Sequence, residues 1–188
     1  MGRWEPGAEG RLMQSAMELY VERGFEQTTA AEIAERAGVT ERTFFRYFTD
    51  KREVLFGGAV ELRRVVLEAI VDAPTTAPPL DAVLAGMFAG AALIGVNRGW
   101  SRQRAALLAA NPSLMERELL KLSALGESAA DALRQRGVAP LTARLAGHTG
   151  VSVFSIGFDT WVGDDSPGDF PACIRLALAE LRELTADA

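Results

Sequence analysis

The chain has little of the chemistry on which enzymes, metal sites and secreted proteins depend. Its 188 residues include one cysteine, Cys173, and one histidine, His148. A single cysteine excludes an internal disulfide framework and suits a reducing cytoplasm. One histidine and one distant cysteine form no evident nucleophile–base pair, and no glycine-rich phosphate loop or metal-ligand spacing appears. The sequence therefore argues against an enzyme and predicts neither a cofactor nor a metal site.

Long apolar runs are also missing. A membrane span needs about 18 or more uninterrupted apolar residues, and the longest apolar stretch here, near Met87 to Val96, ends at Asn97 and Arg98. Arg3 is followed by no apolar segment, so no signal peptide is visible. With 48% hydrophobic and 24% charged residues, the composition is typical of a soluble globular protein. We expect a soluble, cytoplasmic chain that does not enter a membrane.

No alternating run is long enough to predict a strand, and most of the chain has helical spacing. Residues 73–79 form the one proline-rich break, which is expected to be a loop rather than a long linker. We predict an all-α protein with a helix-turn-helix domain at residues 1–50 and a helical bundle for ligand binding and dimerisation at residues 51–188. The expected helices cover residues 7–23, 29–37, 40–48, 50–72, 80–97, 101–110, 113–136, 140–162 and 170–186.

Two short helices near the N-terminus carry clear start and stop signals. Thr29 and Glu32 have the spacing of a capping box, and the helix that they begin ends at Gly38. Thr40 then begins the next helix after only Gly38 and Val39. Two short helices joined by such a turn predict a helix-turn-helix, in which the second helix enters the major groove of DNA.

Successive residues of an α-helix are rotated by about 100° around its axis, and this rotation places the residues of the second helix on two faces. One face is expected to be buried and carries Glu41, Phe44, Phe45 and Phe48. The opposite face carries Arg42, Thr43, Arg46 and Tyr47. Arginine and threonine are side chains that contact guanine, thymine methyl groups or phosphates. An ordinary solvated face is the alternative explanation for the two arginines.

The net charge of −5 weakens a nucleic-acid interpretation, because DNA-binding domains are usually basic. Locally the balance differs, since four cations and the single acid Asp50 lie between residues 42 and 52. Phosphate affinity depends on the charge that faces the duplex, and a dimer presents such a patch twice. The acidic total therefore leaves room for a small basic reading surface.

The stretch GFEQTTAAEIAERAGVTERTFFRYFTDKREVLF resembles the DNA-binding domain of the TetR family of transcriptional regulators, over roughly residues 9–56. The resemblance implies an all-helical homodimer that binds operator DNA through its N-terminal helices. It also implies a C-terminal ligand site whose occupation shifts the two reading heads and releases the operator. The positions that match DNA-contacting residues of the family are Thr29, Thr40, Arg42, Thr43, Phe45, Arg46, Tyr47 and Lys51. Phe45 stands where the family often has tyrosine, so a hydroxyl contact is lost and the ring is free to pack.

The C-terminal part follows the family only in general shape. The stretch NPSLMERELLKLSALGESAADALRQRGV resembles a branch that binds acyl-CoA-like ligands. Apolar residues that could line such a cavity are Met87, Phe88, Leu93, Trp100, Leu107, Phe154, Phe158 and Trp161, and an anionic head group could meet Arg98, Arg102 and Arg104. Packing in an ordinary core is the alternative for the apolar set, and a solvated surface is the alternative for the arginines.

Two stripes in the last two helices predict the dimer interface, at residues 140–186. Small residues form the first stripe, at Ala143, Ala146, Gly147 and Gly150, and larger ones form the second, at Ile174, Leu178, Leu181 and Leu184. Paired helices from two subunits would build a four-helix interface with two-fold symmetry and predict a near-palindromic operator. His148 is expected to pack or to form a hydrogen bond rather than to bind a ligand.

Two functions remain in competition. The first is a repressor that a small apolar or amphipathic effector releases from its operator. The second is a DNA-binding protein without a small-molecule effector, which responds to a protein partner or acts as an activator.

Overall fold

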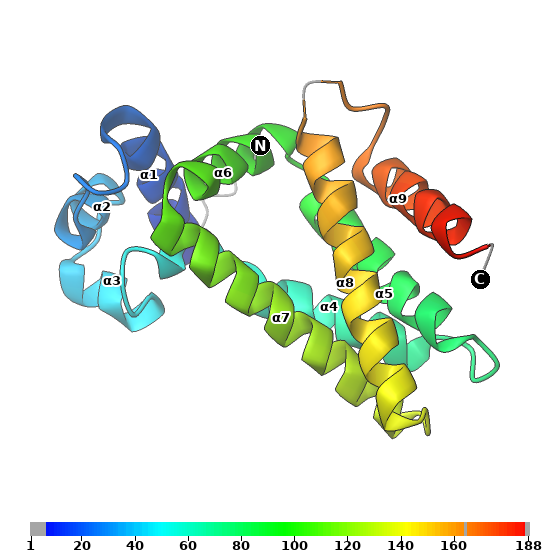
Figure 1. The fold of residues 1–188 in the computed structure, drawn as a ribbon. Coiled ribbons are helices and arrows are strands. Elements are labelled where there is room, and N and C mark those ends of the chain that lie inside the picture. Colours follow the sequence, from blue (N-terminus) through cyan, green and yellow to red (C-terminus); the bar gives the residue numbers. More distant parts are fainter. Residues whose placement is uncertain (1–6, 164, 187–188) are drawn as a thin grey trace, which may run out of the picture. The chain divides into compact units, whose positions relative to one another are not determined.

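A computed structural model describes residues 7–163 and 165–186, and within that range the chain forms helices joined by loops (Figure 1). The all-α prediction is confirmed. The elements are α1 (Ala8–Arg23), α2 (Ala30–Arg36), α3 (Glu41–Tyr47), the 3-10 helix η1 (Glu53–Phe56), α4 (Ala59–Asp72), α5 (Pro79–Ile94), α6 (Arg98–Ala110), α7 (Pro112–Gln135), α8 (Pro140–Val162) and α9 (Phe170–Thr185).

Contacts between residues divide the chain into two compact units. The first unit, called the reading unit below, comprises Met1–Ala59 and Gln103–Met115. The second, called the helical unit, comprises Val60–Arg102 and Glu116–Ala188. A single cut after residue 50 was expected from the sequence, whereas the reading unit extends nine residues further and gains parts of α6 and α7. No local pattern predicts this addition, because those parts of α6 and α7 lie far along the chain from α1 to α3.

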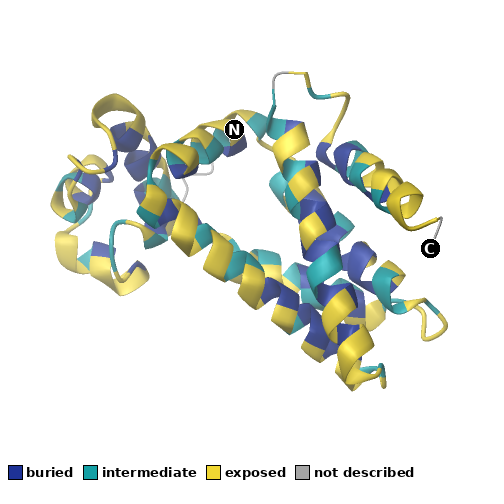
Figure 2. Ribbon diagram, in the orientation of Figure 1, coloured by how far each residue is buried: buried dark blue, intermediate teal, exposed yellow. Residues whose placement is uncertain are grey.

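The reading unit is built around α1. This helix packs against α2 and η1, and α2 packs in turn against α3. Its buried residues follow the spacing read from the sequence, and the unit's fully buried large side chains include Leu12, Met17, Leu19, Tyr20, Ile33 and Phe44. Buried positions, coloured dark blue in Figure 2, recur along α1 to α3. Helices as short as α2 and α3 are marginal alone, so their stability comes from this shared core.

The continuous fourth helix predicted for residues 50–72 is wrong. Asp50 does cap a helical turn, because one of its carboxylate oxygens accepts from the N–H groups of Arg52 and Glu53 at 2.8 and 3.2 Å. That turn is only η1, and α4 starts separately at Ala59. Gly57 between them approaches the core so closely that an added Cβ would lie 2.9 Å from the sulfur of Met13. Two consecutive glycines thus separate the reading unit from α4.

Helix α6 begins three residues earlier than predicted, at Arg98 rather than at residue 101. The Asn97 side chain explains the difference, because its oxygen accepts the N–H of Trp100 at 3.0 Å. An asparagine in this position is a favourable helix N-cap. Asn97 therefore starts a helix in a stretch that the sequence suggested to be a loop.

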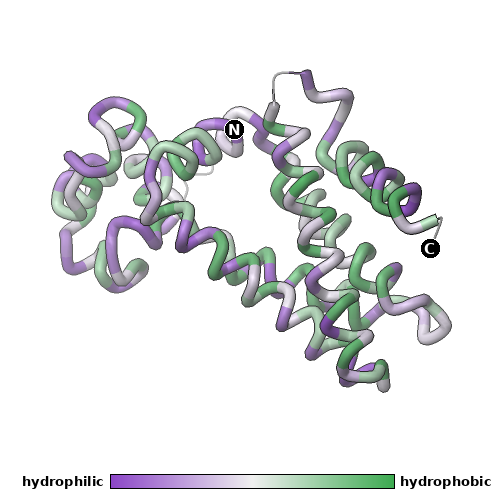
Figure 3. The backbone as a smooth tube through the Cα atoms, viewed as in Figure 1, coloured by the Kyte–Doolittle hydropathy of each residue, from purple (hydrophilic) through white to green (hydrophobic). Residues whose placement is uncertain are grey.

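The helical unit packs α5, α8 and α9 around a largely aliphatic core. In Figure 3, α5 and α8 are mostly green, in keeping with their apolar sequences. Glycines allow close approach of the helices: a Cβ at Gly147 would lie 2.6 Å from the carbonyl oxygen of Gly126 on α7, and one at Gly150 would lie 2.3 Å from Val83 on α5. The small residues of α8 therefore serve packing within the subunit.

Arg136 binds main-chain carbonyl groups at the C-terminal end of α4. The Arg136 guanidinium donates to the carbonyl oxygens of Ile70, Val71, Ala73 and Pro74, at 2.7–3.1 Å, beyond the last turn of α4. Carbonyls at a helix C-terminus lack partners within the helix, and cations suit the negative end of the helix dipole. Arg136 thus fixes where α4 stops.

No single helix among the described residues is long and apolar enough to cross a membrane. The bent pair of α5 and α6, at 102° to each other, meets the length and composition criteria jointly.

Candidate DNA-binding site

Helix α2 begins with the capping box predicted from the sequence. The Glu32 N–H donates to the Thr29 hydroxyl at 3.2 Å, and the Glu32 carboxylate accepts from the Thr29 N–H at 2.8 Å. Hydrogen bonds from the Thr29 N–H and, next, from its hydroxyl hold the pKa of Glu32 below its usual value. Gly38 then turns the chain with a φ of +67°, which a residue with a side chain rarely adopts.

Helix α3 begins at Thr40, whose hydroxyl accepts the N–H of Thr43 at 3.2 Å. The two threonine hydroxyls also lie 3.0 Å apart and share a hydrogen bond. Both side chains therefore help to define the first turn of α3. The helix-turn-helix geometry expected from the spacing of caps and glycine is present.

Two of the three phenylalanines of α3 anchor it. Phe44 is fully buried and Phe48 is 4% exposed, with ring centroids 5.8 Å apart. Phe45, which the helical wheel placed on the buried face, is instead 51% exposed. The correction has a geometric cause: Phe45 lies about 100° around the helix from Phe44 and about 60° from Arg42. It belongs to the edge of the outward face.

The outward face of α3 carries two cations. Arg42 is exposed and has no hydrogen bond or ion pair that the structure records within residues 7–163 and 165–186. The Arg46 guanidinium lies over the Tyr47 ring, 4.9 Å from its centroid, and donates to the Tyr47 hydroxyl at 3.3 Å. Both contacts of Arg46 stay on the same outward face. Arg42, Thr43, Arg46 and Tyr47 therefore form the surface that the sequence predicted, and we call it the reading face.

Lys51 is not on the reading face in this structure. Its ammonium donates to the carbonyl oxygens of Phe25, Glu26 and Thr28 at 2.9, 3.1 and 3.0 Å. It also lies 4.4 Å from the centroid of the Phe25 ring. An ammonium has three N–H donors, so all of them are used between α1 and α2. This placement favours a positioning role over the phosphate contact that the resemblance implied.

Tyr20 completes this arrangement from α1. Its hydroxyl donates to the Lys51 carbonyl oxygen at 2.5 Å, and its ring meets Phe25 edge to face at 5.3 Å. Burial, aided by the charge of Asp50, raises the pKa of Tyr20 far above its ordinary value, so the phenol stays neutral and a donor. Lys51 is thus held through its main chain by α1 while its side chain holds the α1–α2 turn.

Other cations of the reading unit are engaged with acids or carbonyls. Arg36 donates both terminal nitrogens to Glu22 at 2.9–3.0 Å, and Arg23 pairs with Glu32 at 3.1 Å. These pairs tie α2 to α1. They also help to explain how an acidic chain can carry a basic reading face: several acids outside α3 are matched to structural cations, as Asp50 is to Arg52.

The residues proposed to line a ligand cavity fall in different parts of the fold, and most belong to the helical unit. Met87, Phe154 and Trp161 are buried in the core of the helical unit, and Phe88 and Phe158 pack at its edge. Trp100 falls in the helical unit, whereas Leu107 falls in the reading unit.

Phe170, which the sequence did not suggest, stands at the centre of the aromatic group in the helical unit. Its ring stacks on Trp161 at 5.0 Å and contacts the rings of Phe154 and Phe158 at 5.0 and 5.6 Å. Four mutually packed rings are first of all a core. The helical spacing of Phe154, Phe158 and Trp161 therefore reflects their packing against Phe170 of α9.

The arginines proposed for an anionic head group are partly used elsewhere. Arg98 donates to the carbonyl oxygens of Trp161 and Gly163 at 2.8 and 2.6 Å and so ends α8. Arg104 donates to the Leu55 carbonyl oxygen at 2.9 Å and covers the Phe56 ring, within the reading unit. Arg98 and Arg104 therefore each hold main-chain carbonyl oxygens of their own unit.

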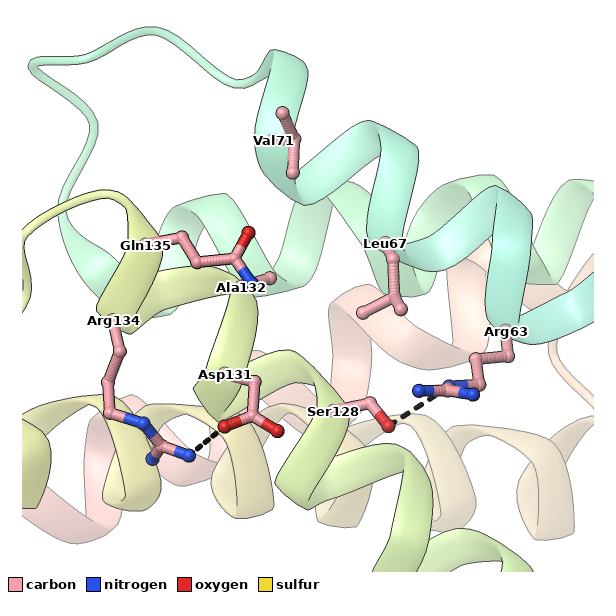
Figure 4. A pocket seen from close by; sticks show the side chains of 8 residues that line it. All are labelled: Arg63, Leu67, Val71, Ser128, Asp131, Ala132, Arg134 and Gln135. Carbon is pink, nitrogen blue, oxygen red and sulfur yellow. Dashed lines mark hydrogen bonds and ion pairs between the residues drawn. The ribbon is translucent and has the colours of Figure 1, made fainter.

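Two hollows lie in the helical unit, and neither is lined by the predicted ligand residues. The first, of about 540 Å³, lies between α4 and α7 (Figure 4). Its apolar floor includes Leu67 and Ala132, while Arg63 donates to the Ser128 hydroxyl at 3.0 Å and Arg134 pairs with Asp131. These four polar side chains thus pair with one another across the rim. The second hollow lies along α8 and α9.

Most residues of the two stripes predicted for dimerisation are buried, whereas Leu184 of the second stripe is exposed. Ala143, Ala146, Ile174 and Leu178 are buried inside the subunit. Solvent instead meets a row of large apolar residues beside the second hollow, which spans about 680 Å³. The row, called the apolar face below, comprises Leu141 (72% exposed), Leu145 (61%), Ile156 (57%) and Leu184 (82%). Leu141, Leu145 and Ile156 have helical spacing in the sequence, and this spacing could have predicted the exposed row. The prediction from the sequence instead relied on the small residues of the same helix.

His148 borders the apolar face and forms a hydrogen bond, as expected. Its Nε2 lies 2.9 Å from a Glu127 carboxylate oxygen on α7. This hydrogen bond, followed by the charges of His148 and Arg144, lowers the pKa of Glu127. Within the described part of the chain, no group of three or more His, Cys, Asp or Glu side chains could hold a metal ion.

A capped two-helix motif with a solvent-facing arginine pair is the architecture of a helix-turn-helix DNA-binding protein. Comparison with known families agrees: residues 12–56 match the bacterial regulatory proteins of the tetR family, and residues 77–186 match the MftR C-terminal domain. The chain therefore belongs to the TetR family of DNA-binding transcriptional regulators and has a C-terminal domain of the MftR type. The family consists of regulators and not of enzymes, in agreement with the sequence analysis.

Individual relatives match less of the chain. Over 78 residues it is 37% identical to the HTH-type transcriptional regulator TcmR of Streptomyces glaucescens, which covers 42% of this chain. The matched segment spans only about a third, 34%, of that relative. The assignment of the family rests on the two matching domains rather than on this relative.

Solved structures show the same fold. A complex of SmeT with triclosan has a TM-score of 0.65 at 17% identity, covering 94% of this chain and 90% of that one. FadR of Thermus thermophilus, a repressor in complex with lauroyl-CoA, has a TM-score of 0.56 at 24% identity, covering 94% of both chains. At such identities the likeness concerns the fold alone.

Proposed function

We propose that the chain is a ligand-responsive repressor that binds a near-palindromic operator through the reading face. The observation that carries this proposal is the pair of solvent-facing arginines, Arg42 and Arg46, on a helix fixed by buried Phe44 and Phe48. Guanidinium groups on a helix that enters the major groove can bind guanine or phosphate. We place this activity in the cytoplasm, where operator DNA is accessible.

The hydrogen bonds that the other candidate residues form within the chain decide which of them remain able to contact DNA. The hydroxyls of Thr29 and Thr40 already cap helices, and a hydroxyl can accept and donate at once, so a phosphate contact is compatible with capping. Thr43 and Tyr47 flank Arg46 and offer a methyl group and a phenol. We propose these four as DNA contacts and exclude Lys51, whose donors are used internally.

Replacing Arg46 by alanine should weaken specific operator binding by about 1–3 kcal/mol if its guanidinium contacts a base edge. Gel-shift titrations on an operator selected from random DNA, alongside a scrambled duplex, would measure this change. The loss should be larger on the operator, because base contacts specify sequence whereas phosphate contacts do not.

Arg64→Ala is the matched control for this measurement, since Arg64 lies on α4 and pairs with Glu61 and Glu68. Its operator affinity should equal that of the parent. Equal operator affinities of Arg46→Ala and the parent would contradict the proposal that Arg46 contacts DNA.

We further propose that the apolar face forms a two-fold homodimer interface within residues 140–186. Large apolar side chains with 57–82% exposure are costly to leave in water, and several gather along α8 and the end of α9. Two such helix pairs would build a four-helix interface. The proposal keeps the predicted segment and Leu184, and it adds Leu141, Leu145 and Ile156 to the residues that meet the partner.

Leu145→Asp should convert the dimer into a monomer, because a carboxylate would be buried at the interface without a partner. Sedimentation velocity over a range of concentrations would show the change in mass. Leu119→Asp is the control: Leu119 is 59% exposed, nearly as much as Leu145 at 61%, but it belongs to α7 and does not line the second hollow. A dimeric Leu145→Asp variant would contradict this interface.

We propose that the effector is a small apolar or amphipathic molecule that binds the helical unit, with acyl-CoA-like compounds as one class. Support comes from the resemblance of residues 111–138 to regulators of that branch.

Thermal unfolding in the presence of acyl-CoAs, fatty acids and amphipathic drugs should identify the class of effector. A ligand present at 100 times its Kd stabilises the folded state by about 2.7 kcal/mol, and the melting temperature rises accordingly. A true effector should also release the operator in gel shifts. Absence of stabilisation across the panel would favour the alternative, a regulator that has no small-molecule effector.

A further inference from the structure

Phe45 is an apolar side chain on an otherwise polar and cationic surface. It is 51% exposed, while its neighbours Phe44 and Phe48 are 0% and 4% exposed. One edge of its ring rests on Phe44, with centroids 5.2 Å apart and the planes at 82°. This contact orients the ring without covering it. Phe45 is therefore held outward rather than packed away.

The position of Phe45 on α3 places it beside the reading face. It follows Arg42 by three residues and precedes Arg46 by one, and residues three apart on a helix are neighbours. If the two arginines enter the major groove, as proposed above, the phenyl ring enters with them. Phe45 is then at one border of the reading face, and Tyr47 is at the other.

The chemistry of the groove limits what a phenyl ring can recognise there. Base edges in the major groove present nitrogen and oxygen donors and acceptors, and thymine adds the one apolar group, its 5-methyl. A phenyl ring cannot form a hydrogen bond with a phosphate, as a tyrosine hydroxyl could. Contact with a methyl group, however, removes apolar surface of both partners from water.

We propose that Phe45 is a specificity-determining residue that reads the 5-methyl group of a thymine in each operator half-site. This inference rests on the proposed DNA-binding function. Burial of one methyl-sized group contributes about 0.8 kcal/mol, which is about fourfold in Kd. A dimer that makes the contact in both half-sites should lose about fifteenfold when both methyl groups are absent.

The test uses the tightest duplex that the parent chain selects from random-sequence DNA. Deoxyuridine, which lacks only the methyl group, replaces thymine at each symmetric pair of positions in turn. The parent should bind about fifteenfold more weakly at one such pair. Phe45→Ala should bind the thymine and deoxyuridine forms of that duplex equally, at a salt concentration where both proteins bind.

Thr43→Ser is the matched control, because it removes the other methyl group near the centre of the face and keeps the hydroxyl that contacts Thr40. This variant should discriminate as the parent does. Loss of discrimination in Thr43→Ser with retention in Phe45→Ala would overturn the proposal, as would equal binding of thymine and deoxyuridine by the parent at every pair. Failure to enrich any duplex would be a different result, and it would refute DNA binding itself.

Discussion

The ammonium of Lys51 is the contact on which the geometry of the reading unit depends. It joins three carbonyl oxygens of the α1–α2 turn to the segment that follows α3, and Tyr20 holds the main chain of Lys51 from the opposite direction. Three charge-assisted hydrogen bonds at 2.9–3.1 Å hold main-chain carbonyl oxygens of this turn. Since Thr29, the N-cap of α2, directly follows this turn, the position of α3 relative to α1 depends on the same contact.

The same device recurs throughout the molecule. Three arginines donate to main-chain carbonyl oxygens: Arg98 at the C-terminus of α8, Arg104 at η1 and Arg136 at the C-terminus of α4. Cations used in this way are unavailable for DNA or for an anionic effector. What remains facing solvent on α3 is the pair Arg42 and Arg46. A net charge of −5 is therefore compatible with operator binding, because the affinity comes from a small patch that a dimer presents twice.

Local signals in the sequence predicted the local structure well. The capping box at Thr29, the glycine turn and the cap at Thr40 correctly positioned α2 and α3, because these effects act within a few residues. Predictions that required knowledge of distant partners fared differently. A helical wheel could not show that Phe45 lies beyond the reach of the core, and no spacing shows that Lys51 faces three carbonyls 23–26 residues earlier. Small residues of α8 suggested an interface, yet they pack against α5 and α7.

The division of cations between structure and DNA can be measured through the salt dependence of operator binding. Each phosphate neutralised by a cation contributes about 0.9 to the slope of log K against log salt concentration. Lys51→Gln should leave this slope as in the parent while lowering the stability of the protein, whereas Arg42→Gln/Arg46→Gln should reduce the slope. A slope reduced by about 1.8 in the Lys51→Gln dimer would show that both lysines contact phosphates and would contradict the account.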